Sequence, residues 1–158
     1  MSGKTEPVIK KGSDPLNQVI IRPVSTAISS VLSRTPVTPN QVSVFALFLA
    51  VIAAVLIATR TGFYDRVFAA VLLYFYLVFD CVDGELARRK RVSSPYGKWL
   101  DGMVDTLSTS LLLFALAYAS VSQSGLVAWL WGFAAVIGFN AANFSYQYGQ
   151  LVFAPPKG

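Results

Sequence analysis

The chain has 158 residues, of which 54% are hydrophobic and 13% charged, and its formal net charge is +5. This composition excludes a disordered chain and is more apolar than that of an ordinary soluble domain. With no histidine and a single cysteine, Cys81, the sequence excludes histidine-based metal binding, an internal disulfide and a cysteine-rich zinc site. The basic residues fall at the ends of apolar segments, so we expect lipid headgroups or phosphate groups as their partners and no nucleic acid.

The first 34 residues divide into a tail and an amphipathic helix. Residues 1–13 are polar and lack the apolar core of a signal peptide, so we expect a disordered tail. From Asp14-Pro15 onward, apolar residues recur at helical spacing and serines occupy the other side. Residues 14–34 are therefore predicted to form a helix in the membrane interface, kinked at Pro23. The alternative, a helix packed on a soluble domain, lacks such a domain in the remaining sequence.

Residues 35–158 are predicted to form one transmembrane domain, so the expected fold is an all-α integral membrane protein. Four of its segments are long and apolar enough to span a bilayer: residues 42–59, 67–88, 96–119 and 126–144. Pro155-Pro156 is expected to end the helical part.

Lys and Arg are distributed unevenly around these segments. Only Arg60 and Arg66 lie between the first and the second span, on one side of the predicted membrane. The other eleven basic residues lie on the opposite side: Lys4, Lys10, Lys11, Arg22, Arg34, Arg88, Arg89, Lys90, Arg91, Lys98 and Lys157. By the positive-inside rule, the side with eleven faces the cytoplasm. We therefore expect a protein of the cell or inner membrane whose active site faces the cytoplasm.

Two pairs of aspartates lie at this cytoplasmic end. Asp80 and Asp83 are three residues apart, and Asp101 and Asp105 four apart, so each pair shares one helix face. Because a short loop joins the two helices, we expect them to lie side by side with the carboxylates meeting. Four carboxylates in a low-dielectric pocket repel one another unless protons or cations intervene, and two divalent cations would suit phosphoryl transfer. The alternative, solvated charges or partners of the loop arginines, is unfavourable for acids in apolar helices.

Residues 80–105 resemble the signature of the CDP-alcohol phosphotransferase family at eight fixed positions: Asp80, Asp83, Gly84, Ala87, Arg88, Gly97, Asp101 and Asp105. Members transfer a substituted phosphate from a CDP-linked alcohol, such as CDP-diacylglycerol, to an acceptor alcohol and release CMP. The resemblance implies a six-span homodimer in the lipid membrane and Mg²⁺ or Mn²⁺ as cofactor. It also implies that Asp80, Asp83, Asp101 and Asp105 bind metal and that Asp105 is the base that deprotonates the acceptor.

The small and basic residues of the signature are candidates for nucleotide binding. From the residues alone, Gly84 and Gly97 fit close approach by a nucleotide and tight helix packing equally well. The resemblance favours nucleotide contact for both and for Ala87. Arg88 fits a phosphate clamp, with a topology charge as the alternative.

Three further residues near the signature allow more than one interpretation. Ser94 and Asn40 are candidates for the cytidine pocket, with a turn and a helix cap as their respective alternatives. Lys98 fits either acceptor-phosphate binding or placement of its charge at the membrane interface. Glu85 is expected to face solvent.

The acceptor is predicted less specifically. Residues 37–40, the preceding amphipathic helix and residues 93–97 resemble family members that use inositol phosphate, with glycerol phosphate or another alcohol as alternatives. Four spans where the family has six suggest a truncated chain or a fragment. A non-catalytic fragment or scaffold that binds CDP and metal is therefore the alternative function. A cation transporter is disfavoured because the acids gather at one end of the spans.

Overall fold

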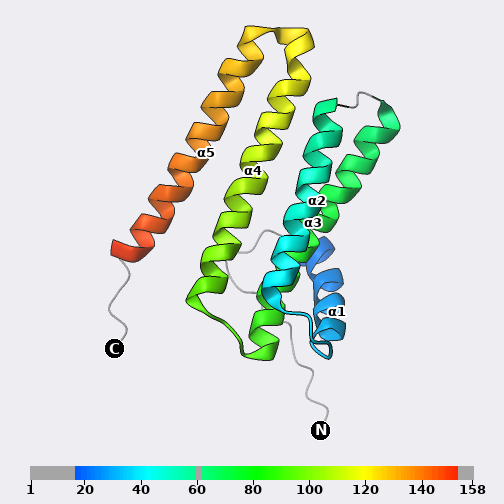
Figure 1. The fold of residues 1–158 in the computed structure, drawn as a ribbon, viewed down its shortest axis with the longest axis vertical. Helices are drawn as coiled ribbons and strands as arrows, with labels where there is room; N and C mark the ends of the chain where they lie inside the picture. The colour runs from blue at the N-terminus through cyan, green and yellow to red at the C-terminus, as the bar shows by residue number, and fades with distance from the viewer. Residues whose placement is uncertain (1–16, 60–61, 153–158) are drawn as a thin grey trace.

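The computed structural model describes residues 17–59 and 62–152 (Figure 1). All regular structure in these ranges is helical: η1 (Asn17–Ile21), α1 (Arg22–Leu32), α2 (Pro39–Thr59), α3 (Phe63–Lys90), α4 (Pro95–Ser124) and α5 (Leu126–Val152). The four longest helices are long and apolar enough to cross a membrane. The predicted all-α integral membrane fold with four spans is confirmed. The predicted tail, residues 1–13, lies outside the described residues.

Local sequence determines where the helices begin and end near the aspartates. Thr38 and Gln41 form a capping box at the start of α2, in which each side chain accepts a hydrogen bond from the other residue's backbone N–H (3.3 and 2.9 Å). Ser94 caps α4 by accepting a hydrogen bond from the Gly97 N–H (3.0 Å). α3 ends at Lys90, followed by Arg91 in the left-handed conformation (φ 57°).

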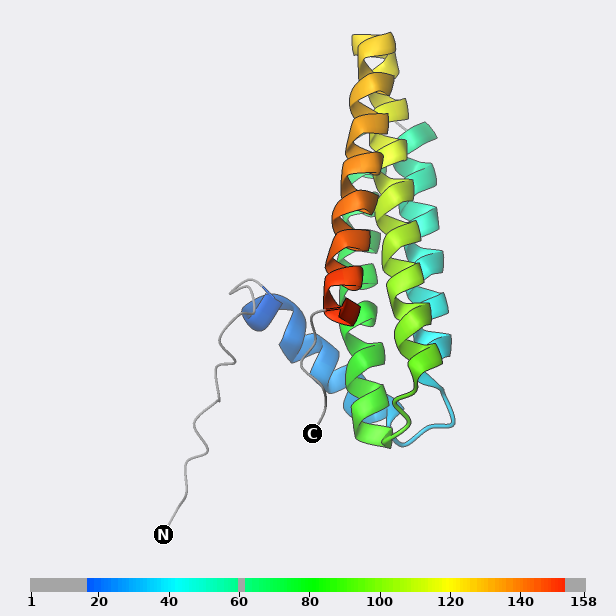
Figure 2. The ribbon, with the colours of Figure 1, turned by 90° about the vertical axis from the view of Figure 1, so that its left-hand side faces the viewer.

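α2 holds the bundle together. It packs against both α3 and α4, and α5 packs against α4 (Figures 1 and 2). Ala46, Ala50 and Ala53 are fully buried along α2, and their small side chains let neighbouring backbones approach closely.

The two aspartate-bearing helices are arranged differently from the prediction. The backbones of α3 and α4 make far fewer contacts with each other than either makes with α2. The expectation that these helices pack directly side by side is therefore wrong, because α2 packs against both of them. Their side chains nevertheless converge at the end that carries the aspartates, as described below.

α1 lies at this same end, steeply inclined to the long helices (Figure 2). Ile21 of η1 and Val24, Ile28 and Leu32 of α1 pack against a buried cluster contributed by α2 and α3. In the described part of the predicted 14–34 segment, one π-helical turn changes to α-helix at Arg22, next to Pro23. The irregularity thus occurs where the kink is predicted.

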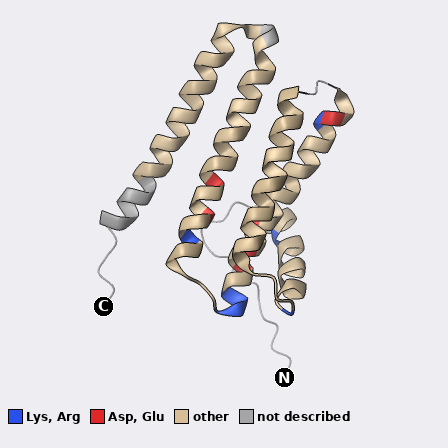
Figure 3. Cartoon of the chain, viewed as in Figure 1, with Lys and Arg blue, Asp and Glu red and all other residues tan. Residues whose placement is uncertain are grey.

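The last two helices extend beyond the predicted membrane spans, residues 96–119 and 126–144. α4 continues to Ser124, and Gly125 (φ 54°) makes the turn into α5, which continues to Val152. Charged side chains are sparse along these helices and gather at the end of the bundle where α1 lies (Figure 3). The bundle therefore has one strongly basic end, which also carries the aspartates.

Candidate metal and nucleotide site

Three carboxylates from two helices converge inside the bundle. Asp80 of α3 and Asp101 and Asp105 of α4 each place one carboxylate oxygen within 4.8 Å of the other two, and all three side chains are half-buried. Carboxylate oxygens are the ligands that Mg²⁺ and Mn²⁺ prefer, and a cation offsets the repulsion among close negative charges. The donor set therefore fits a hard divalent cation.

Asp83, the fourth predicted ligand, lies beside this group rather than in it. Its side chain is buried and accepts a hydrogen bond from the hydroxyl of Ser43 on α2. It remains within electrostatic reach of Asp101 and Asp105. Asp83 therefore connects the carboxylate group to the start of α2.

A cavity of about 210 Å³ opens between the start of α2, the last turns of α3 and the start of α4. Eight of the ten predicted site residues line it: Asn40, Asp83, Gly84, Ala87, Arg88, Ser94, Gly97 and Asp101. The remaining two, Asp80 and Asp105, belong to the carboxylate group. Asp101 belongs to both, so the cavity adjoins the carboxylates.

The two signature glycines leave room in this cavity. A Cβ atom on Gly97 would lie 3.3 Å from Ser94 Oγ and 3.5 Å from Asn40 Oδ1. A Cβ atom on Gly84 would meet only the guanidinium of Arg88, at 3.4 and 3.9 Å, and no backbone atom of another helix within 4 Å. Tight packing between helices is therefore not what requires glycine at position 84.

Ser94 and Asn40 were candidates for the cytidine pocket, with a turn and a helix cap as their respective alternatives. Ser94 is the N-cap of α4 and also lines the cavity, so its place in the cytidine pocket stays a prediction. Asn40 also lines the cavity, whereas the capping box of α2 is formed by Thr38 and Gln41. Lys98, whose role the sequence did not decide, is exposed and lines the cavity as well.

Two residues next to the aspartates were not predicted from the sequence. The hydroxyl of Tyr76, which is 7% exposed, donates a hydrogen bond to Asp105 Oδ1 (3.2 Å). Ser43 is the buried hydroxyl that donates to Asp83. Helical spacing could have found both, since Tyr76 precedes Asp80 by four residues and Ser43 follows Asn40 by three.

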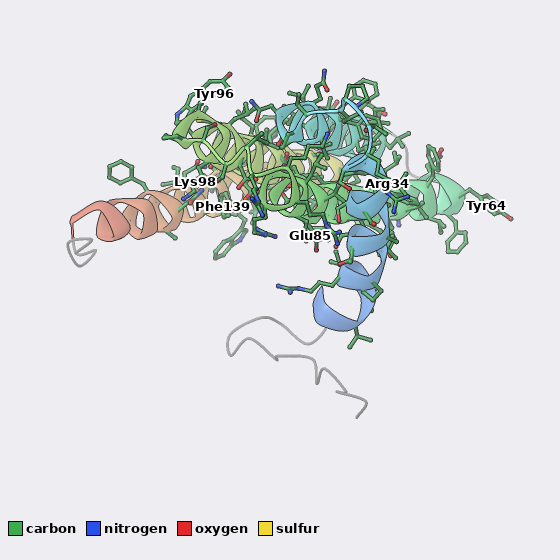
Figure 4. The ribbon with its side chains drawn as sticks, turned by 90° about the horizontal axis from the view of Figure 1, so that it is seen from below. Arg34, Tyr64, Glu85, Tyr96, Lys98 and Phe139 are labelled. Atoms are coloured by element: carbon green, nitrogen blue, oxygen red, sulfur yellow. The ribbon has the colours of Figure 1, made fainter. Side chains whose placement is uncertain are left out.

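The expectation that Glu85 faces solvent is wrong. The side chain is half-buried, and its carboxylate accepts hydrogen bonds from Ser25 (3.1 Å) and Ser29 (2.8 Å) of α1. α1 covers this face of α3, which the sequence of α3 alone did not indicate. Figure 4, a view from below, shows Glu85 beside α1.

Most of the chain is similar in sequence to proteins of one known family. The sequence model of the CDP-alcohol phosphatidyltransferase family matches residues 36–151, which include α2 to α4 and nearly all of α5. The match thus covers every residue of the carboxylate group and of the cavity.

Several curated proteins are similar to the chain. An archaetidylinositol phosphate synthase of Pyrococcus horikoshii is 29% identical over 126 residues, which are 78% of this chain and 61% of that protein. A bifunctional IPC transferase and DIPP synthase of Thermococcus kodakarensis is 31% identical over 116 residues, covering 73% and 24%. Choline/ethanolaminephosphotransferase 2 of Arabidopsis thaliana is 40% identical over 82 residues, covering 51% and 21%.

The chain thus spans between about a fifth and three fifths of the length of these relatives. The family predicted from the signature is confirmed, and the names of the archaeal relatives support the resemblance to its inositol-phosphate branch. The chain, an all-α integral membrane protein with a carboxylate group beside a cavity of about 210 Å³, belongs to the CDP-alcohol phosphatidyltransferase family.

Proposed function

We propose that this chain carries the metal and donor site of an enzyme that transfers a substituted phosphate from a CDP-linked alcohol to an acceptor alcohol and releases CMP. The observation that carries the proposal is the convergence of Asp80, Asp101 and Asp105 beside a cavity lined by the other signature residues. The family match over residues 36–151 supports it.

The carboxylates would hold Mg²⁺ or Mn²⁺, with Asp80, Asp101 and Asp105 as one ligand set and Asp83 as a further ligand from the cavity side. Bound there, divalent cations would neutralise the negative charge of the pyrophosphate and of the leaving CMP. One oxygen of Asp105 accepts the hydrogen bond from Tyr76, which fixes the orientation of the carboxylate.

The cavity residues would bind the cytidine end of the donor. Gly84, Ala87 and Gly97 leave space for the nucleotide, and Asn40 and Ser94 offer polar atoms toward it. The guanidinium of Arg88 would contact a phosphate through its planar donors. The donor would thereby be positioned with its phosphorus next to the carboxylate group.

In the transfer step, Asp105 takes the proton from the acceptor hydroxyl. The oxygen of that hydroxyl forms a bond to the phosphorus, the bond from phosphorus to the CMP oxygen breaks, and CMP leaves with the electron pair. With no histidine in the chain, a carboxylate close to the attacking oxygen is the available base.

For the substrates, we propose CDP-diacylglycerol or a similar lipid as donor and inositol phosphate as the first acceptor to test. The names of the Pyrococcus horikoshii relative and of a Corynebacterium glutamicum phosphatidylinositol phosphate synthase, 32% identical over 101 residues, support this choice. Glycerol phosphate is the second acceptor. The family resemblance further suggests a homodimer whose site faces the cytoplasm.

CMP release by the purified chain in lipid nanodiscs tests the function. We expect release with CDP-diacylglycerol, Mg²⁺ and one acceptor of a panel, abolished by EDTA and restored by added Mg²⁺. Asp105→Asn and Asp101→Asn should each lower the rate at least about 100-fold. Asp65→Asn, in the first turn of α3 at the opposite end of the helix, is the matched control and should retain the wild-type rate.

Retained turnover in both Asp105→Asn and Asp101→Asn would contradict the proposal. Magnesium-dependent CDP binding without CMP release from any acceptor would favour the alternative, a non-catalytic fragment or scaffold. Equilibrium binding of radiolabelled CDP to the same nanodiscs distinguishes this outcome from a protein that has no nucleotide site.

A further inference from the structure

Glu85 lies within the signature stretch but takes no part in the cavity. It follows Gly84 directly, and because successive helical residues are about 100° apart, it faces away from Asp83. Its carboxylate contacts three hydroxyls of α1: Oε2 accepts from Ser29 (2.8 Å), and Oε1 accepts from Ser25 (3.1 Å) and Thr26 (3.4 Å). Glu85 therefore joins the helix of the signature to α1.

This contact is part of a closely packed interface. Ser25 and Ser29 are one helical turn apart, and both side chains are fully buried. The apolar residues of α1 pack against Val78, Val82 and Leu86 of α3, which are fully buried as well. A carboxylate next to such surfaces is costly without donors, and an ionised carboxylate has only acceptor atoms. The serine hydroxyls supply donors to Glu85, although each hydroxyl also lies 3.1 Å from a backbone carbonyl oxygen of α1, that of Arg22 or Thr26.

A second attachment lies five residues farther along α3. The ammonium group of Lys90 donates hydrogen bonds to the backbone carbonyls of Thr35 (2.6 Å) and Val37 (2.7 Å). These carbonyls belong to the connection between α1 and α2. α3 therefore holds both α1 and the connection that follows it.

This connection leads into a wall of the cavity. Two residues after Val37, α2 begins at Pro39, and Pro39, Asn40 and Ser43 line the cavity opposite Gly84 and Arg88 of α3. The position of the first turn of α2 relative to α3 determines the width of the space between them. Whatever fixes α1 and the connection on α3 therefore helps to fix that width, together with the direct packing of α2 on α3.

We propose that Glu85 is a positioning residue: by anchoring α1 on α3, it sets the position of the α2 wall of the donor cavity. The proposal rests on the proposed function for its effect on the donor, while the anchoring of α1 is independent of any activity. Glu85 acts through α1 and the connection and touches neither donor nor metal. It should affect donor binding more than the rate of the chemical step.

The single cysteine measures the anchoring directly. Cys81 lies one turn before Glu85 on α3, is half-exposed and is within electrostatic reach of Arg22 of α1. In the full chain in nanodiscs, Glu85→Ala should speed maleimide labelling of Cys81 several-fold, because α1 no longer covers this face and the neighbouring negative charge of Glu85 is removed. The double variant Ser25→Ala/Ser29→Ala removes the two shorter of the three bonds, leaves the charge of Glu85 near Cys81 in place and should act alike. Ser33→Ala is the matched control, since its hydroxyl bonds to the Ser30 carbonyl of its own helix.

Donor binding measures the consequence. Glu85→Ala should weaken magnesium-dependent CDP binding, and raise the KM for the donor, about tenfold, with kcat within about threefold of wild type. Glu85→Gln keeps one carbonyl oxygen that can accept from Ser29 or Ser25, and should recover most of the affinity. Because the serine pair leaves α3 unaltered, it tests the proposal even if Glu85→Ala does not fold.

Each outcome decides one part of the proposal. Unchanged Cys81 labelling in both Glu85→Ala and the serine variant would overturn the anchoring. Faster labelling with wild-type CDP affinity and KM would overturn the positioning role. A kcat that falls while KM stays constant would overturn it too. Absence of CDP binding by the wild-type chain would refute the proposed function and the donor role with it, and Cys81 labelling would still decide whether Glu85 anchors α1.

Discussion

Tyr76 illustrates how one residue outside the signature can act on the site. Its hydroxyl hydrogen-bonds Asp105 from the helix that also carries Asp80, so it links the two halves of the carboxylate group. A hydrogen bond to a charged group contributes about 1.5–3 kcal/mol. Its loss should let the Asp105 carboxylate rotate away from the acceptor.

We therefore predict that Tyr76→Phe lowers kcat for CMP release about tenfold, with the KM for the donor within about twofold. The substitution removes one oxygen and leaves the buried ring in place, so the unfolding temperature in detergent should change little. Tyr74→Phe is the control, because within the described residues that hydroxyl donates to the Ile20 carbonyl of η1, at 3.5 Å, and not to an aspartate. An unchanged kcat in Tyr76→Phe would show that Asp105 does not depend on this bond.

A substitution at Gly97 tests whether this glycine leaves space for a ligand in the cavity. We predict that Gly97→Ala raises the KM for the CDP-linked donor about tenfold, because the added methyl group lies 3.3–3.5 Å from Ser94 Oγ and Asn40 Oδ1 in the cavity. Gly138→Ala in α5, whose Cβ meets no atom within 4 Å, should bind the donor as wild type does. Equal donor KM values in the two variants would contradict this role of Gly97.

At the scale of elements, α5 is held to α4 by small and polar contacts. Asn140 and Asn143 of α5 donate hydrogen bonds to Ser110 (3.1 Å) and Thr106 (2.8 Å) of α4. Gly132 lies so close to Ala117 of α4 that an added Cβ would overlap the Ala117 methyl group. Such small-residue contacts and interhelical hydrogen bonds are typical of helix association in membranes.

We predict that Gly132→Ala lowers the unfolding temperature in detergent by several degrees, since the helices must separate to admit the methyl group. Gly138→Ala gains the same helix propensity without a clash, and should unfold at or slightly above the wild-type temperature. A Gly132→Ala variant as stable as Gly138→Ala would show that α4 and α5 do not depend on this contact.

The elements themselves were largely predictable, and their ends less so. Uninterrupted apolar length predicted the four spans, because bilayer thickness sets a minimum helix length. The predicted spans stop at residues 119 and 144, where polar residues such as Ser120 and Ser145 follow, whereas the helices continue to Ser124 and Val152. A change from apolar to polar residues marks where a helix leaves the membrane, and the helix can continue beyond that point.

At the scale of the whole molecule, the basic end of the bundle determines the expected orientation (Figure 3). In a Cys81→Ala background, a membrane-impermeant maleimide added to intact cells should label Tyr64→Cys, at the start of α3, and not Ser93→Cys, beside the cavity. Both positions are exposed in the structure, so accessibility alone does not separate them. Labelling of Ser93→Cys without Tyr64→Cys would reverse the proposed orientation.

The sequence by itself determined the fold class and the four spans, and it predicted which residues form the site. These follow from properties that act along one segment: apolar length, helical periodicity, and the cost of placing carboxylates in apolar helices. Tertiary structure alone decided three things: that α2 packs against both aspartate-bearing helices, that Asp83 bonds to Ser43 beside the other three aspartates, and that Glu85 anchors α1. Each depends on which faces of distant segments meet. Helical periodicity tells which residues share a face but not which face of another helix lies opposite.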